Sequence, residues 1–288
     1  MKSDLILNDL VIFRFFAYNT SISAIAQLVE QVTVNHWVAG SSPARGARII
    51  MPIYNKDKSD PYKLSRTRIE NFCRCPKCFY LEEKLGISRP SSFPFNLNNA
   101  VDELLKDEFD SFRGTKENHP YILNSGLDAR PFSHPEIEDW RTRNKGIGFL
   151  DEETNFYFYG LVDDVWINTK TDQLIIVDYK ATSKDGEVSL DAPWQISYKR
   201  QVEIYQWLFR NNGFDVQDTA YFVYCNAIRK NIPFENKLNF KIKLIAYKGD
   251  DSWIPSVIRK MKDCLDAESP PAPSKSCEHC RYVLKANI

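Results

Sequence analysis

The chain has 288 residues, of which 43% are hydrophobic and 13% aromatic, enough to bury a sizeable core in one or two domains. Its 38 basic and 38 acidic residues give a formal net charge of zero, so any basic groove for a polyanion must be local. The 7 cysteines are an odd number, and without a secretory signal they indicate metal binding in a reducing compartment rather than a disulfide framework. The expected location is therefore the cytoplasm.

Residues 1–50 differ in character from the rest, with only 4 of the 38 basic and 3 of the 38 acidic residues. Polar residues interrupt the apolar stretch Leu5–Tyr18, which is therefore neither a membrane span nor a clean secretory signal. The segment resembles a recurrent spurious translation of transfer-RNA genes, so we expect it to be an extension before one domain at 51–288. The competing interpretation is a short amphipathic helix over Ile22–Val34 that docks on the domain.

The first expected helix of the domain begins after Ser65, which is a good N-cap residue. Pro76 breaks this helix, and a second helical segment continues to Gly86. Cys75 and Cys78 lie at the break.

A further helix is expected to begin at Asn96 or Asn98, followed by a loop-rich insertion with short helices over residues 113–143. Apolar residues at helical spacing form one stripe on this helix: Ala100, Val101, Leu104, Leu105 and Phe109. Asp102 lies beside the stripe. A short strand near Ile147–Leu150 then leads into the next motif.

Two runs rich in aromatic and β-branched residues, 155–168 and 173–180, flank a short polar connection. This pattern predicts a β-hairpin. If Asn168 pairs with Gln173, the register of the whole hairpin follows.

That register puts Asp163 directly opposite Asp178, with Lys180 on the same face because side chains alternate along a strand. The other residues of this face are apolar: Leu161, Val165, Ile167, Leu174 and Ile176. Like charges opposed on an apolar face are destabilising, and a divalent cation with oxygen ligands is the simplest compensation. The alternative is a register shifted by one residue, which leaves the acids solvated.

A long helix over about Trp194–Asn211 follows, with Gln201 one turn before Tyr205 on its inward stripe. Gln201 is either a core amide bonded to the backbone or part of a pair that faces a ligand. The remaining expected elements are two strands and a helix: Thr219–Ala227, Leu238–Ala246 and Trp253–Leu265.

Two Cys-x-x-Cys pairs lie near opposite ends of the domain, Cys75 with Cys78 and Cys277 with Cys280. Together they predict one four-thiolate centre suited to Zn²⁺ or to an iron–sulfur cluster. Cys73 can replace Cys75 in this interpretation, and the alternative is that all these thiols are free.

Four motifs in chain order resemble the PD-(D/E)XK nuclease superfamily in its RecB-like branch, which includes the AddB nuclease domain and CRISPR-associated RecB-like exonucleases. These motifs are Ser65–Leu81 with Cys75-Pro76, Gly160-x-x-Asp163, Asp178-x-Lys180 and Gln201-x-x-x-Tyr205. The resemblance implies an α/β fold with a restriction-endonuclease-like core, a mixed central β-sheet flanked by helices. It also implies a deoxyribonuclease dependent on Mg²⁺ or Mn²⁺, acting like an exonuclease on single-stranded ends in DNA repair, recombination or defence.

The resemblance assigns the metal to Asp102, Asp163, Asp178 and the carbonyl group of Tyr179. Lys180 then orients the attacking water or stabilises developing charge, while Gln201 and Tyr205 position the strand. The basic residues expected near phosphates are Lys184, Lys199 and Arg200.

Two features depart from the branch. Asp102 stands where the branch usually has a metal-binding histidine, although a carboxylate also binds a hard cation. Iron–sulfur members carry one early and three late cysteines, whereas this chain has an early pair and a late pair. The alternative function is a catalytically silent nucleic-acid-binding module with a structural metal centre. DNA or RNA preference, cleavage polarity, and a helicase or CRISPR-type partner do not follow from the sequence.

Overall fold

A computed structural model describes residues 53–90, 95–143, 145–230, 233 and 235–286. The expected extension over residues 1–50 and its competing amphipathic helix lie outside these residues, so both interpretations stay predictions. None of the helices in the described ranges is long and apolar enough to cross a membrane.

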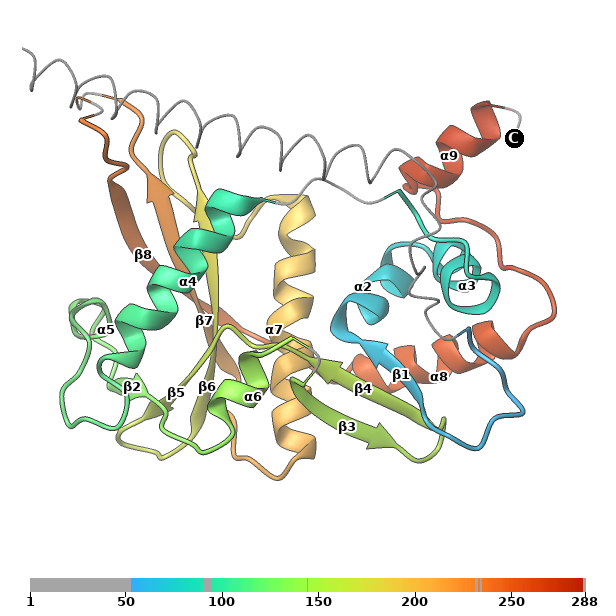
Figure 1. Ribbon diagram of the computed structural model, residues 1–288, viewed down its shortest axis with the longest axis horizontal. Coiled ribbons are helices and arrows are strands. Elements are labelled where there is room, and N and C mark those ends of the chain that lie inside the picture. Colours follow the sequence, from blue (N-terminus) through green and yellow to red (C-terminus); the bar gives the residue numbers. More distant parts are fainter. Residues whose placement is uncertain (1–52, 91–94, 144, 231–232, 234, 287–288) are drawn as a thin grey trace, which may run out of the picture. The chain divides into compact units, whose positions relative to one another are not determined.

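The central element is a mixed sheet of five strands in the order β2-β5-β6-β7-β8. The strands are β2 (Ala129–Pro131), β5 (Asp164–Asn168), β6 (Leu174–Thr182), β7 (Thr219–Ala227) and β8 (Phe240–Lys248). β6 and β7 are parallel, and the other neighbours are antiparallel. Helices pack on both faces of the sheet (Figure 1), which confirms the expected α/β class with a mixed central sheet flanked by helices.

A second, three-stranded sheet has the order β1-β4-β3. Its strands are β1 (Tyr62–Ser65), β3 (Ile147–Asp151) and β4 (Phe156–Gly160). The prediction of one continuous strand over 155–168 is therefore wrong, because the chain leaves this sheet after Gly160 and enters the five-stranded sheet as β5. The register predicted for the hairpin is confirmed, since Asp164 pairs with Val177 and the amide of Asn168 donates to the Gln173 carbonyl oxygen at 2.9 Å.

The principal helices lie where the sequence predicts them. They are α2 (Arg66–Arg74), α3 (Pro76–Leu85), α4 (Asn96–Asp110), α7 (Ile196–Asn211) and α8 (Ile254–Asp266). Pro76 separates α2 from α3, and Gly86 ends α3 in the left-handed region at φ 67°. The shorter elements are α5 (Pro120–Asn124), α6 (Ile137–Arg141), the 3₁₀ turn η1 (Pro193–Gln195) and α9 (Glu278–Lys285).

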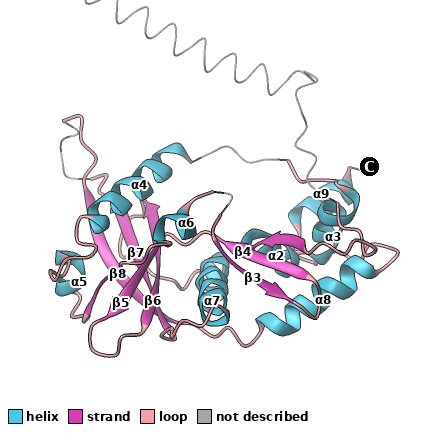
Figure 2. Ribbon diagram, turned by 60° about the horizontal axis from the view of Figure 1, so that its bottom comes forward, coloured by secondary structure: helices cyan, strands magenta, loops and turns pink. Residues whose placement is uncertain are grey.

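Two apolar cores lie on opposite faces of the five-stranded sheet. On one face, Val202 and Leu208 of α7 pack with Val165 and Ile176 of the sheet. Figure 2 shows α7 between the five-stranded sheet and the strands β3 and β4, and the same core includes residues of both sheets.

The opposite face of the sheet is covered by α4. Its buried residues Val101, Leu105 and Phe109 pack with Trp166 and Tyr179. Two members of the predicted stripe were wrong: Ala100 is exposed and Leu104 is 67% exposed, because the helix turns both away from the sheet. The α4 helix therefore rests on three apolar side chains and keeps its polar side free to contribute to a site.

Candidate active site and cysteine centre

The two acids of the hairpin meet at the start of β5. Asp163 directly precedes β5, whose first residue Asp164 pairs with Val177, and the Asp163 carboxylate lies near Asp178 of β6. The backbone amide of Tyr179 donates to Asp163 Oδ2 at 2.9 Å, and Arg141 Nε donates to the Asp163 carbonyl oxygen at 3.2 Å. These bonds fix both the main chain and the side chain of Asp163.

Asp178 is fully buried, with an ion pair between its Oδ2 and the Lys180 ammonium group. Its Oδ1 has no hydrogen-bond donor among the described residues. Burial raises the pKa of Asp178 to about 7; Lys180 opposes this rise and the nearby Asp163 carboxylate adds to it. A buried carboxylate with one oxygen lacking a donor is a place where a cation stabilises the fold.

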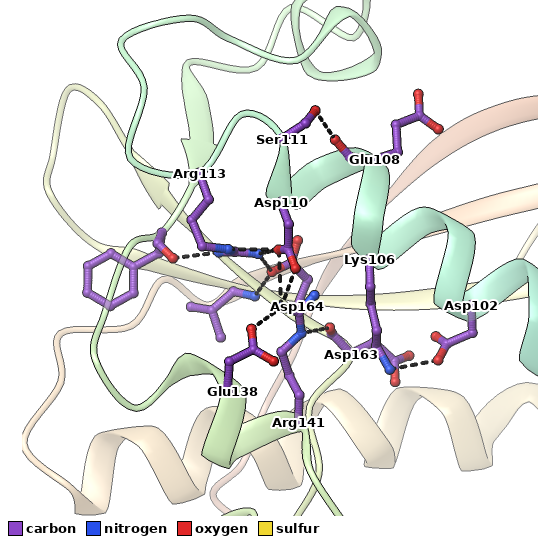
Figure 3. A network of polar contacts seen from close by, with 12 residues as sticks. Asp102, Lys106, Glu108, Asp110, Ser111, Arg113, Glu138, Arg141, Asp163 and Asp164 are labelled. Carbon is purple, nitrogen blue, oxygen red and sulfur yellow. Dashed lines mark hydrogen bonds and ion pairs between the residues drawn. The ribbon is translucent and has the colours of Figure 1, made fainter.

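Asp164 shows what a satisfied buried aspartate looks like in this molecule. Its carboxylate accepts from Arg113 at 2.7 Å, from the indole of Trp166 at 2.9 Å and from the Tyr179 hydroxyl at 2.8 Å. Figure 3 shows the contact of Asp164 with Arg113, which also contacts Asp110. Asp164 therefore anchors β5 beneath the site, whereas Asp178 is left with an oxygen free for a ligand.

Asp102 of α4 joins the hairpin acids from the opposite face of the sheet. Its carboxylate pairs with Lys106 at 2.7 Å, and in Figure 3 it lies in the same region as Asp163. Burial and the Asp163 charge raise the pKa of Asp102, although Lys106 opposes both effects. The carboxylates of Asp102 and Asp163 are thus close enough to repel one another, as two ligands of one cation would be before it binds.

The α7 helix supplies the amide and phenol of the predicted pair. Gln201 Nε2 donates to the Tyr205 hydroxyl at 3.3 Å. A Cβ atom at Gly160 would lie 2.6 Å from the Tyr205 ring, so the glycine of the Gly-x-x-Asp motif is what lets α7 approach β4. Of the two interpretations of Gln201, the structure supports the pair that faces a ligand, because Gln201 lines the cleft described next.

A cleft of about 510 Å³ collects these residues. Its walls include Asp102, Asp163, Lys180, Gln201 and the backbone neighbour Tyr179. Fully buried Asp178 lies behind Lys180, and Tyr205 lies behind Gln201. The structure thus brings together all the residues that the sequence assigned to catalysis and to the divalent cation.

Arg66 and Tyr198 are among the wall residues that were not predicted for this site. Arg66 begins α2, and Tyr198 of α7 lies under the Lys180 ammonium group, 4.6 Å from ring centroid to nitrogen. Tyr198 follows from helical spacing, since it is one turn before Gln201. Nothing in the sequence indicates that Arg66 turns towards acids located about a hundred positions later.

The cysteine pairs form a second centre. The sulfur atoms of Cys75, Cys78, Cys277 and Cys280 lie within 4.8 Å of one another. Three of the sulfur–sulfur distances are 3.5, 3.6 and 3.9 Å. Cys73 is not part of this group; it packs against the main core, and burial raises the pKa of its thiol to about 11.

The geometry of the four thiols fits a metal ion. A single tetrahedral ion with metal–sulfur bonds of about 2.3 Å sets its sulfur ligands about 3.8 Å apart. Burial by itself raises the pKa of the Cys75 thiol, but hydrogen bonds from the backbone of Cys78 and Ser274 outweigh it and lower the pKa to about 6. A thiol that ionises readily is a ready metal ligand.

Comparison with known protein families matches residues 63–283 to the PD-(D/E)XK nuclease superfamily. The chain belongs to this superfamily. No curated protein matches the chain. Members of the superfamily are nucleases that use divalent metal ions, so the function class suggested by the motifs is confirmed at that level, together with the fold.

A divalent cation would account for the buried Asp178 oxygen that lacks a donor among the described residues. The cleft acids Asp102, Asp163 and Asp178 are oxygen donors, the ligand type that Mg²⁺ and Mn²⁺ prefer. The free Oδ1 of Asp178 and the like charges around it are what such a cation would neutralise. The residues present therefore fit a divalent cation.

Proposed function

We propose that this protein is a RecB-like, metal-dependent deoxyribonuclease that degrades single-stranded DNA from an end, in repair, recombination or defence. The observation that carries the proposal is the buried Asp178 with its free oxygen, opposed by Asp163 and joined by Asp102 at one cleft. Asp164, by contrast, accepts hydrogen bonds through both carboxylate oxygens, whereas Oδ1 of Asp178 has no donor among the described residues.

Asp102, Asp163, Asp178 and the carbonyl group of Tyr179 would hold Mg²⁺ or Mn²⁺. When bound, the cation polarises a phosphodiester and lowers the pKa of the attacking water. The backbone amide of Tyr179 donates a hydrogen bond to the Asp163 carboxylate, so this ligand is oriented before the cation binds.

In this proposal, Lys180 is the positively charged side chain nearest to the phosphodiester that is cleaved. Its ammonium group pairs with Asp178 and lies over the Tyr198 ring. Burial would lower the pKa of Lys180, but the Asp178 and Asp163 charges outweigh it and raise the pKa, so the group stays protonated. A permanent charge at this place suits water orientation and stabilisation of developing negative charge.

Gln201 and Tyr205 would position the strand. Their mutual hydrogen bond holds the amide of Gln201 at the cleft wall while Tyr205 is packed against Gly160. Because Gln201 donates with only one of its hydrogens to Tyr205, the amide keeps capacity for a phosphate or a sugar.

Exposed aromatic side chains at the cleft favour a single strand. Phe95, at the start of α4, lines the cleft and is 72% exposed. On the α7 side, Trp194 is 61% exposed and contacts the cleft residue Tyr198 edge to face, with ring centroids 5.3 Å apart. Unstacked bases bind such rings, whereas bases of a duplex are already stacked.

The cysteine centre would hold Zn²⁺ with a structural role. The three sulfur–sulfur distances of 3.5–3.9 Å suit one tetrahedral ion, whereas an iron–sulfur cluster needs more room because its four thiolates are shared among two or four iron atoms. The centre is formed by residues outside the cleft, so it is assigned to stability rather than to the reaction.

The test is cleavage of an end-labelled single-stranded DNA in Mn²⁺ or Mg²⁺. Wild type is expected to shorten the linear strand, to leave a circular single strand intact and to lose all activity in EDTA. Asp178→Asn should abolish cleavage, because it removes a metal ligand. Relief of like-charge repulsion should leave the metal-free stability unchanged or higher by about 1 kcal/mol.

Asp263→Asn is the matched control, since Asp263 is exposed on α8 and does not line the cleft. It should cleave like wild type. Undiminished cleavage by Asp178→Asn would remove the nuclease assignment of this cleft.

A further inference from the structure

Arg66 is a cleft arginine whose guanidinium group forms no salt bridge with a carboxylate of the described residues. It is the first residue of α2 and lines the same cleft as Asp163, Lys180 and Gln201. Among the described residues it forms no ion pair, and its neighbouring partner is the neutral Tyr205 hydroxyl.

Several other partly buried arginines in the described part of the chain are paired. Arg200, one residue before Gln201, makes two hydrogen bonds to Glu70 at 2.7 and 2.8 Å. Arg113 pairs with Asp110 and Asp164. Glu70 occupies Nε and Nη2 of Arg200, and the contact of Arg200 with phosphates stays a prediction. Arg66 is the wall residue whose fork of donors is available to a ligand.

The charge of Arg66 is retained inside the cleft. Burial would lower the pKa of its guanidinium group, but Tyr205, Asp178 and Glu70 outweigh that effect and raise it. A desolvated guanidinium group prefers a planar oxyanion that accepts two hydrogen bonds, such as a phosphate.

The start of α2 adds to the attraction for an anion. Its N-cap residue Ser65 makes no side-chain hydrogen bond to the first turn, and the first turn carries no acidic residue. The first amide groups of the helix and its dipole therefore reinforce the positive end at which Arg66 stands. Figure 1 shows this helix beside α7, which carries Gln201.

We propose that Arg66 binds one backbone phosphate of the single strand and thereby positions the strand against the acids. This inference rests on the proposed nuclease function and adds a binding group from α2 to a site otherwise built from α4, the hairpin and α7. Arg66 is a substrate-binding residue in this account and takes no proton.

The test measures binding without cleavage. A 5′-fluorescein-labelled oligothymidylate of twenty nucleotides is titrated without chelator in buffer depleted of Mg²⁺ and Mn²⁺, so that the cysteine centre keeps its metal, and is followed by fluorescence anisotropy at several salt concentrations. Arg66→Ala should weaken binding about tenfold, the effect of losing one charge-assisted contact. The slope of log K against log salt should become shallower by about 0.7, as expected for one phosphate contact to a single strand.

Arg66→Lys and Arg259→Ala complete the series. Arg66→Lys keeps the charge without the fork, so it should restore the salt slope and only part of the affinity. Arg259 is exposed on α8, where its side chain is 3.9 Å from Glu153. Arg259→Ala removes the same charge from outside the cleft, and its affinity should match wild type.

Oligothymidylates that carry a single neutral methylphosphonate linkage provide a test on folded wild-type protein. At one position along the oligonucleotide, the neutral linkage should weaken binding to wild type about tenfold. The same linkage should leave the affinity for Arg66→Ala unchanged, because that variant no longer contacts the phosphate. Wild-type affinity and salt slope in Arg66→Ala, or no such position, would overturn the proposal. Cleavage by wild type in Mn²⁺ is scored separately, so failure of the nuclease function is recognised independently.

Discussion

Asp164 and Asp178 are both fully buried, yet they have opposite surroundings. Asp164 accepts from Arg113, Trp166 and Tyr179, whereas Asp178 has Lys180 as its one ion-pair partner among the described residues. The difference supports our proposal that Asp164 anchors β5 and Asp178 is a metal ligand. Because a buried anion without donors is costly, the two aspartates should respond differently to the same substitution.

Lys180→Ala should separate binding of the cation from cleavage. The change removes a charge beside the reacting phosphate and removes no oxygen ligand, so Mn²⁺ binding measured by calorimetry should persist. Cleavage of single-stranded DNA should fall by about two to three orders of magnitude, the usual effect of losing one preorganised charge. Lys180→Arg, which keeps the charge, should retain more activity than Lys180→Ala. Loss of Mn²⁺ binding in Lys180→Ala would instead give this residue a structural role.

His119 should make stability depend on pH. Its ring is buried, packs 4.2 Å from Phe109 and accepts from the Tyr121 amide through Nδ1 at 3.2 Å. Burial lowers the pKa of His119, although Glu108 opposes this shift. The unfolded chain therefore takes up a proton near pH 6.5, before the folded protein does, and stability falls as pH is lowered through that range.

The measurement is urea unfolding of the metal-free protein between pH 7.5 and 5. His119→Asn keeps an acceptor at the N-cap of α5 but has no titrating ring. The fall in unfolding free energy over this range should be smaller for the variant than for wild type. Equal falls in the unfolding free energy of wild type and variant would show that the folded and unfolded states bind a proton at His119 equally.

Among the elements, the segment between β4 and β5 determines the shape of the site. The chain pairs with β1 and β3 up to Gly160 and then enters the five-stranded sheet at Asp164. This change of sheet leaves Asp163 outside the strand ladder, where its side chain turns to the cleft. If the strand continued without a break, the Asp163 side chain would have to follow the alternation of its neighbours between the two faces of the sheet.

Gly160→Ala should therefore disturb both stability and activity. A Cβ atom would lie 2.6 Å from the ring of buried Tyr205, so α7 or the end of β4 must shift. The unfolding free energy should fall by about 1–3 kcal/mol, the usual cost of overpacking, and cleavage should fall with it. Gly160→Ala/Tyr205→Ala should lose less stability than the sum of the single changes, because the second change removes the clash. If the losses of unfolding free energy are additive, the Cβ atom at position 160 does not clash with the Tyr205 ring.

The hairpin register and the main helices were predictable because their signals are local. A turn after Asn168, alternation along each strand and the breaker Pro76 all act within a few residues. The strand β2 and the change of sheet at Gly160 were not predictable, because both depend on partners distant in the sequence. The same limit applies to Arg66, which reaches the acids only through the packing of α2 on α7.

Across the molecule, the cysteine centre links the beginning of the described domain to its end. Cys75 and Cys280 are 205 residues apart and their sulfur atoms lie 3.9 Å apart. Cys75 is also the C-cap of α2, whose first residue is Arg66. Loss of the centre should therefore loosen α2 and, through it, the binding wall of the cleft.

Cys277→Ser should remove one metal equivalent and lower the melting temperature by at least about 5 °C, because the ion binds the folded chain alone. Cys73→Ser is the matched control, since Cys73 is close in sequence but outside the four-thiolate group. It should keep the metal. Anaerobically purified wild type should contain one zinc per chain and be colourless. Iron together with acid-labile sulfide would instead identify an iron–sulfur cluster. If wild type has the same melting temperature with and without its metal, a stabilising metal at this centre is excluded.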